Sequence, residues 1–304
     1  MAVSTKAIKE RLRSVRSSGK VTKAMQLISA AKMRKAVSRA VESRVYAHEL
    51  QKLAASLASQ VQFKESDWLA GFFGKHSVSN EKTPSVEEKK RILVVIAGNR
   101  GLCGAFNTNI GKAALRFLDS QGRDKVDVVV VGKKAFAYLG ARGVAIDRFY
   151  LKKDDPKTSD SITELAEFLH HKVKDSGVDR VTLLFTHFKS SLVQEPKVLQ
   201  LFPLAGDETS RLNLGGRLNL DVRLEPDART ILEGLTLAIG ESVLYQALLE
   251  SNASEHSARM MAMQQATKAA GEMFDGLTLL FNKARQAAIT QELAEISAGR
   301  AALG

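Results

Sequence analysis

Small and apolar residues recur at alternating steps of four and three along the first sixty residues of the chain. This spacing averages 3.5 residues, as in a coiled-coil seam, the strip of a helix that faces a partner helix. The strip runs over seven heptads, and no proline interrupts the first 83 residues. Because proline breaks helix interiors, the pattern predicts one long helix over residues 4–58. Its seam positions are Ile8, Leu12, Val15, Gly19, Thr22, Gln26, Ser29, Met33, Ala36, Ala40, Ser43, Ala47, Leu50, Ala54 and Leu57.

A second seam occupies the other end of the chain, where the last 78 residues also lack proline. We expect a helix over residues 228–302 that begins just after Pro226, with Asp227 as its N-terminal cap. It is weakened locally, by about 1 kcal/mol per residue relative to alanine, at Gly234, Gly240, Gly271 and Gly276. Its seam positions are Met263, Ala266, Ala270, Met273, Leu277, Leu280, Ala284, Ala287, Gln291, Ala294, Ala298 and Ala301.

The middle of the chain has a different pattern, in which apolar runs alternate with helical periodicity. The apolar runs are Arg91–Gly98, Val126–Gly132, Val178–His187 and, as a fourth candidate, Lys197–Leu204. The helical patterns between them are Ala105–Ser120, Lys133–Arg142 and Ser161–Asp175. Strands that alternate with helices predict an α/β domain with a largely parallel sheet.

These patterns predict an α/β fold with two long terminal helices that form an antiparallel coiled coil and a central Rossmann-like domain inserted between them. The expected divisions are a coiled-coil helix over 1–62, a linker or excursion over 63–90, an α/β domain over 91–220 and a second coiled-coil helix over 227–304. We expect the two ends of the chain to pack on each other rather than on the domain. This topology is unusual among soluble enzymes.

The charge is unevenly placed, and it leaves a second interpretation open. The net charge is +12, and residues 1–60 hold 13 Lys and Arg against three Glu. A basic helix of this kind could belong to a scaffold or a nucleic-acid-binding protein. However, Tyr46 is the only aromatic residue in 1–62, and basic residues off a seam normally form a solvated face. We therefore expect no nucleic-acid partner.

Composition also bears on membranes and redox chemistry. No run of 18 apolar residues is present, so we expect no transmembrane helix. The basic, serine-containing start resembles a transit peptide, but its helical pattern continues for some fifty residues, so we expect no such leader. Cys103 is the single cysteine, which excludes an intramolecular disulfide.

One loop could carry chemistry, namely the glycine-containing segment between the first apolar run and the helix that follows. Gly98, Gly101 and Gly104, together with Arg100, could let the backbone approach a phosphate, as in a nucleotide-binding α/β enzyme. The spacing matches neither the dinucleotide nor the Walker pattern, so a tight structural turn is the favoured interpretation. Cys103, in the same loop, is expected to be a small buried hydrophobe. The six histidines show no metal-ligand spacing, and we expect no catalytic site, metal or cofactor.

Three segments together resemble the gamma subunits of F-type ATP synthases. Lys20–Ala36 is similar to the family's N-terminal signature, and Asn99–Asn107 to its strand-end loop, although Asp more usually precedes the Arg. Ser254–Ala301 is similar to the C-terminal signature almost throughout. The segments occur in the family's order, and the resemblance is weak only at 63–90 and 205–220.

The resemblance implies a non-catalytic rotor shaft. The terminal helices would turn inside a hexamer of alpha and beta subunits, and the α/β domain would form a foot that contacts the epsilon subunit and the membrane c-subunit ring. Family positions that touch the beta subunits correspond to Lys23, Met25, Arg285, Gln286, Thr290 and Gln291. The resemblance further implies a peripheral protein on the cytoplasmic face of a bacterial inner membrane. The lone Cys103 excludes the paired-cysteine control of some chloroplast relatives.

Overall fold

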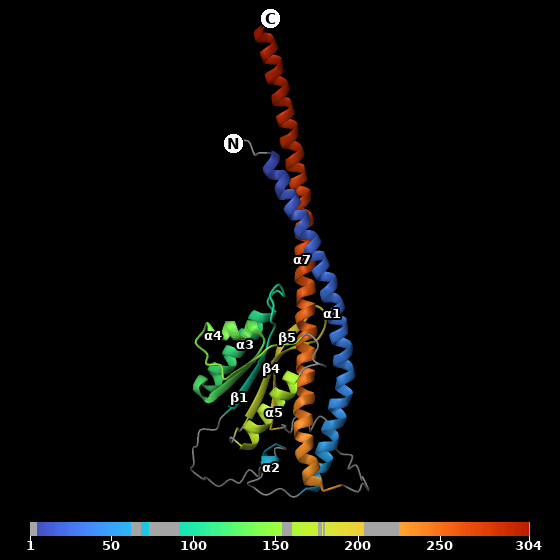
Figure 1. Ribbon diagram of the computed structural model, residues 1–304, viewed down its shortest axis with the longest axis vertical. Coiled ribbons are helices and arrows are strands. Elements are labelled where there is room, and N and C mark those ends of the chain that lie inside the picture. Colours follow the sequence, from blue (N-terminus) through green and yellow to red (C-terminus); the bar gives the residue numbers. More distant parts are fainter. Residues whose placement is uncertain are drawn as a thin grey trace. The chain divides into compact units, whose positions relative to one another are not determined.

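The computed structural model describes residues 5–61, 68–72, 91–153, 160–175, 178, 180–203 and 225–303 (Figure 1). These residues form two compact units. One consists of residues 1–31 with 259–304, and the other of residues 32–258. Two helices contribute to both units, and the second unit also contains the sheet. The predicted linker over 63–90 lies mostly outside the described residues, although α2 (Trp68–Phe72) is a short helix within it.

The two long terminal helices are confirmed. Helix α1 spans Thr5–Gln60 and helix α7 spans Ala228–Leu303. Asp227 caps α7 as expected, because its Oδ1 accepts hydrogen bonds from the amides of Arg229 (2.9 Å) and Thr230 (3.0 Å). Hydrogen bonds from Thr230 hold the pKa of the Asp227 carboxyl below its usual value.

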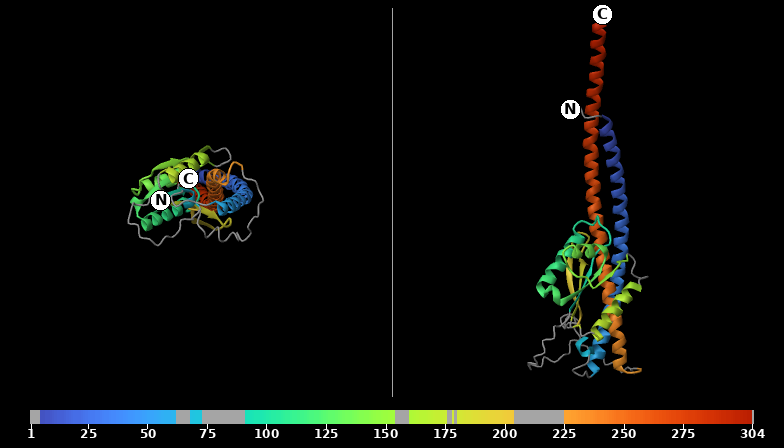
Figure 2. Two further views of the ribbon diagram at one scale, coloured as in Figure 1. Left: turned by 90° about the horizontal axis from the view of Figure 1, so that it is seen from below. Right: turned by 60° about the vertical axis from the view of Figure 1, so that its left-hand side comes forward.

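In the first unit the two helices run antiparallel and close together (Figure 1 and Figure 2). The hydroxyls of Thr22 and Thr267 lie 2.8 Å apart. Earlier on α1, a Cβ added at Gly19 would lie 3.4 Å from the Cβ of Ala270, so small residues permit this close approach. Every predicted seam position of α1 is buried or half-buried.

In the second unit the same antiparallel order continues. Ser43 on α1 hydrogen-bonds to Gln246 on α7, and farther along α1 the side chain of Leu57 packs with Leu232. Between these pairs, Leu50, Ala54 and Ile239 form a small apolar cluster. Residues farther along α1 thus contact residues that lie closer to the N-terminus of α7.

The predicted seam of α7 is only partly correct beyond Ala270. Leu277 and Ala284 are half-buried as predicted, but other predicted positions are exposed. Met273 and Leu280 are 52% and 44% exposed, whereas the neighbouring Phe274 and Phe281 are half-buried. Both members of each neighbouring pair are apolar, so the spacing did not fix the strip. Later predicted positions are exposed as well, namely Ala287, Gln291, Ala294 and Ala298.

The central sheet has five strands in the order β3-β2-β1-β4-β5. Four strands run parallel to one another, namely β1 (Arg91–Ile96), β2 (Val126–Val131), β3 (Arg148–Tyr150) and β4 (Arg180–Phe188). The edge strand β5 (Gln194–Phe202) is antiparallel to β4. The four predicted strands are confirmed, with shifted ends. Strand β3 was missed, because three residues with two exposed side chains leave no apolar run.

Two cores cover the two faces of the sheet, as the alternation of side chains requires. One core joins Leu93 and Val95 to helices α3 (Phe106–Gln121) and α4 (Lys133–Gly140). The other joins Ile92 and Val94 to α2, to α5 (Asp160–Asp175) and to Leu244, Ala247 and Leu248 of α7. A short helical turn, Arg123–Lys125, precedes β2.

The second core corrects one expectation. The terminal helices were predicted to pack on each other rather than on the domain, yet α7 packs on the sheet as well as on α1. The predicted α7 seam began only at Met263, so the earlier part of the helix was left without an assigned face.

By length and composition alone, one helix among the described residues qualifies as a membrane span. It is α7, in which an 18-residue window has a mean hydropathy of 1.2. Because 44% of this window is buried inside the protein, the apolar content also suits a core helix. The packing of Leu244 and Leu248 against the sheet supports the core role.

Candidate functional site

A polar stretch of α7, Glu250–Ser257, is the most unusual feature of the second unit. All of its residues are buried, although Ala253 is its only apolar one. Polar groups lose hydrogen bonds to water when they are buried, so each needs a partner inside the protein. The partners come from the carboxyl-terminal ends of the strands, where parallel α/β sheets usually place their functional groups.

Lys152, just after β3, forms the deepest contact with this stretch. Its Nζ donates to Ser251 Oγ and to Glu255 Oε2, each at 3.0 Å. The side chains of Lys152 and Glu255 are only 2% and 8% exposed, so both charges are neutralised inside the protein. The ring of Phe106 lies beneath the ammonium group, 5.5 Å from it. Two charges held in this way need good geometry to offset their loss of hydration.

Glu250 forms a second polar contact, which joins three elements. Its carboxylate accepts hydrogen bonds from Arg44 of α1 (3.1 Å) and Gln246 of α7 (3.0 Å), and it pairs with His187 of β4. Burial opposes ionisation of Glu250 and is the largest single influence. The hydrogen bonds and the His187 charge outweigh it, so the pKa of Glu250 is lowered.

Backbone carbonyls of strand β4 and of the loops beside the sheet accept further hydrogen bonds from the same stretch of α7. Ser254 Oγ donates to the carbonyl of Thr186 (3.1 Å), and Ser257 Oγ donates to that of Ser191 (2.7 Å). Asn252 Nδ2 donates to the carbonyl of Lys153 (3.3 Å). Hydrogen bonds are directional, so these contacts fix the position of α7 along its own axis and its rotation about that axis, relative to the sheet.

The glycine-containing loop borders this polar cluster. The amide of Gly98 donates to Asn107 Oδ1 (2.9 Å), and Asn107 Nδ2 donates to the carbonyl of Arg100 (3.1 Å). A Cβ added at Gly98 would lie 3.0 Å from both Asn107 and the carboxyl of Glu255, so glycine leaves room for that carboxyl. The Gly98 amide is therefore engaged within the protein rather than presented to a phosphate.

The other residues of this loop have unequal positions. Cys103 is buried, as expected for a small hydrophobe, while Arg100, Gly101 and Gly104 are exposed. Gly104 has φ +55° and Leu102 has φ 61°, so the backbone turns through the left-handed region twice within three residues.

The six predicted contact positions lie in the first unit, on α1 and α7. Met25 is half-buried, and Lys23, Arg285, Gln286, Thr290 and Gln291 are exposed. Two of them hydrogen-bond along their own helix, Lys23 to Gln26 (3.3 Å) and Gln291 to Glu295 (2.9 Å). The exposed positions thus present side chains outward, as a contact with another subunit would require.

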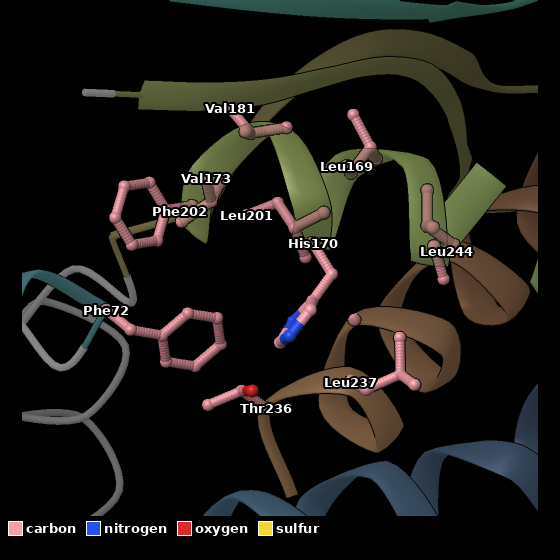
Figure 3. Close-up of a pocket in the computed structure, with 12 residues that line it drawn as sticks. Phe72, Leu169, His170, Val173, Val181, Leu201, Phe202, Thr236, Leu237 and Leu244 are labelled. Atoms are coloured by element: carbon pink, nitrogen blue, oxygen red, sulfur yellow. The ribbon is translucent and has the colours of Figure 1, made fainter. Parts of the chain in front are cut away.

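One enclosed cavity near α5 is too small for a cofactor. Figure 3 shows the side chains that line it, which are mainly apolar, with His170 and Thr236 as polar exceptions. The cavity has a volume of about 30 Å³. It holds roughly one or two water molecules. Burial lowers the pKa of His170, and the charges of Lys174 and His171 lower it further. The described residues contain no group of three or more His, Cys, Asp or Glu side chains that could hold a metal ion.

The sequence pattern did not predict a functional role for Lys152, His187, Glu250 or Glu255. The available signal was the run ESNASEHS, because such polarity in a proline-free helix breaks the apolar period on every face.

Comparisons with known proteins agree along nearly the whole chain. The family model described as ATP synthase matches residues 4–303. The ATP synthase gamma chain of Methylibium petroleiphilum is 36% identical over 302 residues, which cover 98% of this chain and 99% of that protein. The gamma chain of Heliobacterium modesticaldum is also 36% identical, with 98% of each chain covered.

Solved structures show the same fold. The central stalk and c-ring structure of the Tetrahymena thermophila mitochondrial ATP synthase contains a chain with a TM-score of 0.57 and 26% identity, which covers 81% of this chain and 99% of its own. A chain of the Euglena gracilis mitochondrial ATP synthase has a TM-score of 0.63 at 21% identity, with 98% and 94% covered, and supports the fold alone. Full-length similarity, two long antiparallel helices and the sheet domain between them lead to one conclusion: this chain belongs to the ATP synthase gamma chain family.

Proposed function

We propose that the chain is the central rotor shaft of an F-type ATP synthase, which couples rotation of the membrane ring to conformational changes at catalytic sites on the beta subunits. It is a subunit of the complex rather than its catalytic centre, and its partners are the alpha–beta hexamer and the c-ring. It belongs to the F1 part, which is attached to the membrane complex. The observation that carries this proposal is the gamma-chain similarity over the entire length, at both helices and the domain between them.

The finer assignments belong to the same proposal. Residues 1–62 and 227–304 form the shaft, 91–220 form the foot, and 63–90 are a linker or excursion. Lys23, Met25, Arg285, Gln286, Thr290 and Gln291 contact the beta subunits, and the foot also contacts the epsilon subunit. The loop with Gly98, Arg100, Gly101, Cys103 and Gly104 is structural. The complex lies on the cytoplasmic face of a bacterial inner membrane.

The exposed part of α7 supports the contact assignment. Ile289, Leu293 and Ile296 are apolar and exposed in this chain, together with Arg285 and Gln286. Exposed apolar side chains on one helix commonly mark a surface that another protein covers. A surrounding hexamer would cover all sides of the helix, whereas a single flat partner would cover only one.

Affinity purification tests this proposal. A tagged copy of the chain, recovered from detergent-solubilised membranes, is expected to bring down the alpha, beta and epsilon subunits and the c-ring in a complex that hydrolyses ATP. An isolated chain that binds DNA with strong salt dependence, or that binds a nucleotide saturably, and that recovers no such subunits would favour the alternatives.

A further inference from the structure

Torque can pass between a helix and a sheet domain only if the helix neither rolls nor slides on the sheet. Apolar packing holds two surfaces together, but it is non-directional and specifies their relative rotation weakly. Hydrogen bonds and buried ion pairs are directional, and a buried polar group strongly disfavours any arrangement that separates it from its partner. A rotor therefore benefits from polar contacts between its shaft and its foot.

We propose that the buried Lys152–Glu255 ion pair, with Ser251, is the mechanical joint that locks helix α7 to the sheet domain. Lys152 and Glu255 are thus positioning residues for rotary coupling, an inference that rests on the function proposed above. The joint lies within the second unit, and Nζ of Lys152 reaches two partners one helical turn apart on α7, each at 3.0 Å.

The surroundings of the joint fix Lys152 from the sheet side. The carbonyl of Lys152 accepts a hydrogen bond from Asn99 Nδ2, and the next carbonyl, that of Lys153, accepts from Asn252 of α7. Asn99 Oδ1 also accepts from the amide of Lys133 at the start of α4. Lys152 is consequently tied to β1, β3 and α4 as well as to α7, so a force on the helix is shared by the sheet.

Gly98 gives the joint its space. The carboxyl of Glu255 occupies the position where a Cβ at Gly98 would come within 3.0 Å of it. The first glycine of the loop is therefore accounted for by the joint, with no need for a bound phosphate.

The test separates a joint from a merely structural pair. The double variant Lys152→Met/Glu255→Leu replaces both charges with apolar groups, a change that often leaves stability equal or higher. If the ion pair only stabilises the fold, this variant should pump as many protons per ATP hydrolysed as the wild type. The joint predicts normal ATP hydrolysis and melting temperature, but about two- to threefold fewer protons pumped per ATP hydrolysed.

Single-molecule rotation supplies a readout that stability does not change. The hexamer is immobilised, and a bead is attached to a cysteine at the exposed Ala137 of α4. The angular spread of the bead during catalytic pauses is expected to widen in the double variant. The matched control is Lys189→Met/Glu195→Leu, which removes a 2.6 Å ion pair of the same domain whose side chains are about half exposed, and it should leave the spread unchanged.

Three outcomes would overturn either the proposed joint or the proposed function. Wild-type pumping per ATP and wild-type angular spread in the Lys152→Met/Glu255→Leu complex would overturn the joint. If that complex fails to assemble, Ser251→Ala removes one partner of Lys152 at little volume cost, and an unchanged spread there would overturn it instead. A wild-type complex that neither rotates nor pumps would contradict the proposed function itself.

Discussion

Helix α7 has two regions that reverse the usual rule of burial. From Ala247 to Ser257 every residue is buried, although most are polar, and from Gln291 to Arg300 every residue is exposed, although Leu293 and Ile296 are apolar. Both regions belong to one unbroken helix. The comparison shows that α7 remains helical both where its side chains are buried and where they are exposed to solvent. The buried region has its partners within the chain, and the exposed region has the composition of a surface that awaits partners outside it.

The comparison can be tested most strongly by truncating one leucine beside the buried region and one leucine within the exposed region. Leu244 borders the buried region and belongs to the core beneath the sheet, with no exposed surface. Leu244→Ala should lower the free energy of unfolding by about 2–5 kcal/mol, because a cavity remains in a packed core. Leu293→Ala should change it by less than about 0.5 kcal/mol in the isolated chain, since Leu293 is 59% exposed.

Urea denaturation followed by circular dichroism measures both values. Similar destabilisation by the two variants would break the comparison. It would mean that the exposed region is packed in the isolated chain.

Glycine substitutions extend the comparison from side chains to the backbone. Gly132, just after β2, has φ +111°, and an added Cβ would lie 2.3 Å from the carbonyl oxygen of Ala97. Gly132→Ala should therefore destabilise the sheet domain by at least about 2 kcal/mol. Gly276 lies in α7 with open space around its Cα, so Gly276→Ala should stabilise the helix by about 0.5–1 kcal/mol.

Thermal melting of both variants and the wild type shows whether each substitution raises or lowers the stability. A lowered melting temperature for Gly276→Ala would contradict the assignment of open space. A neutral Gly132→Ala would show that the loop can move away from Ala97.

Spacing alone recovered much of the fold, because α1 carries its seam in a single clear strip and the strands carry uninterrupted Val and Ile. It could not fix the α7 seam, since Met273 and Phe274 are equally apolar and only the packed helix distinguishes them. Nor could it place Glu255 inside. A carboxylate on a helix is normally solvated, and its partner Lys152 lies 103 residues earlier in the chain.

Acid stability probes the buried region through its carboxylate. The pKa of Glu250 is lowered in the folded chain, so this group stabilises the fold above its unfolded pKa of about 4.3 and loses that contribution as pH falls through the folded value. Stability of the wild type should therefore decrease as pH falls below about 4.3. Glu250→Gln should flatten that decrease and lower stability at pH 7, because the charged bonds to Arg44 and His187 are lost.

Urea titrations at several pH values between about 3 and 7 check this sign. The control is Glu295→Gln in the exposed region, where the side chain is solvated. If stability falls as steeply with pH in Glu250→Gln as in the wild type, Glu250 is not the cause of the loss of stability in acid.

The smallest expected change in stability, and the most informative about function, concerns Arg285 and Gln286. Both are exposed on α7, next to the half-buried Ala284. An exposed charge that pairs with an acidic loop contributes only about 0–1 kcal/mol, and more where a surrounding hexamer excludes water. Replacing both by alanine should leave helix content and melting temperature of the free chain nearly unchanged, while ATP-driven proton pumping by the assembled complex falls.

The competing explanation is that their aliphatic stems cover the partner helix. Measuring pumping and melting temperature side by side separates the two, because full pumping with a lowered melting temperature would support packing alone. If pumping falls and the melting temperature does not, Arg285 and Gln286 act through a partner rather than through packing within the chain.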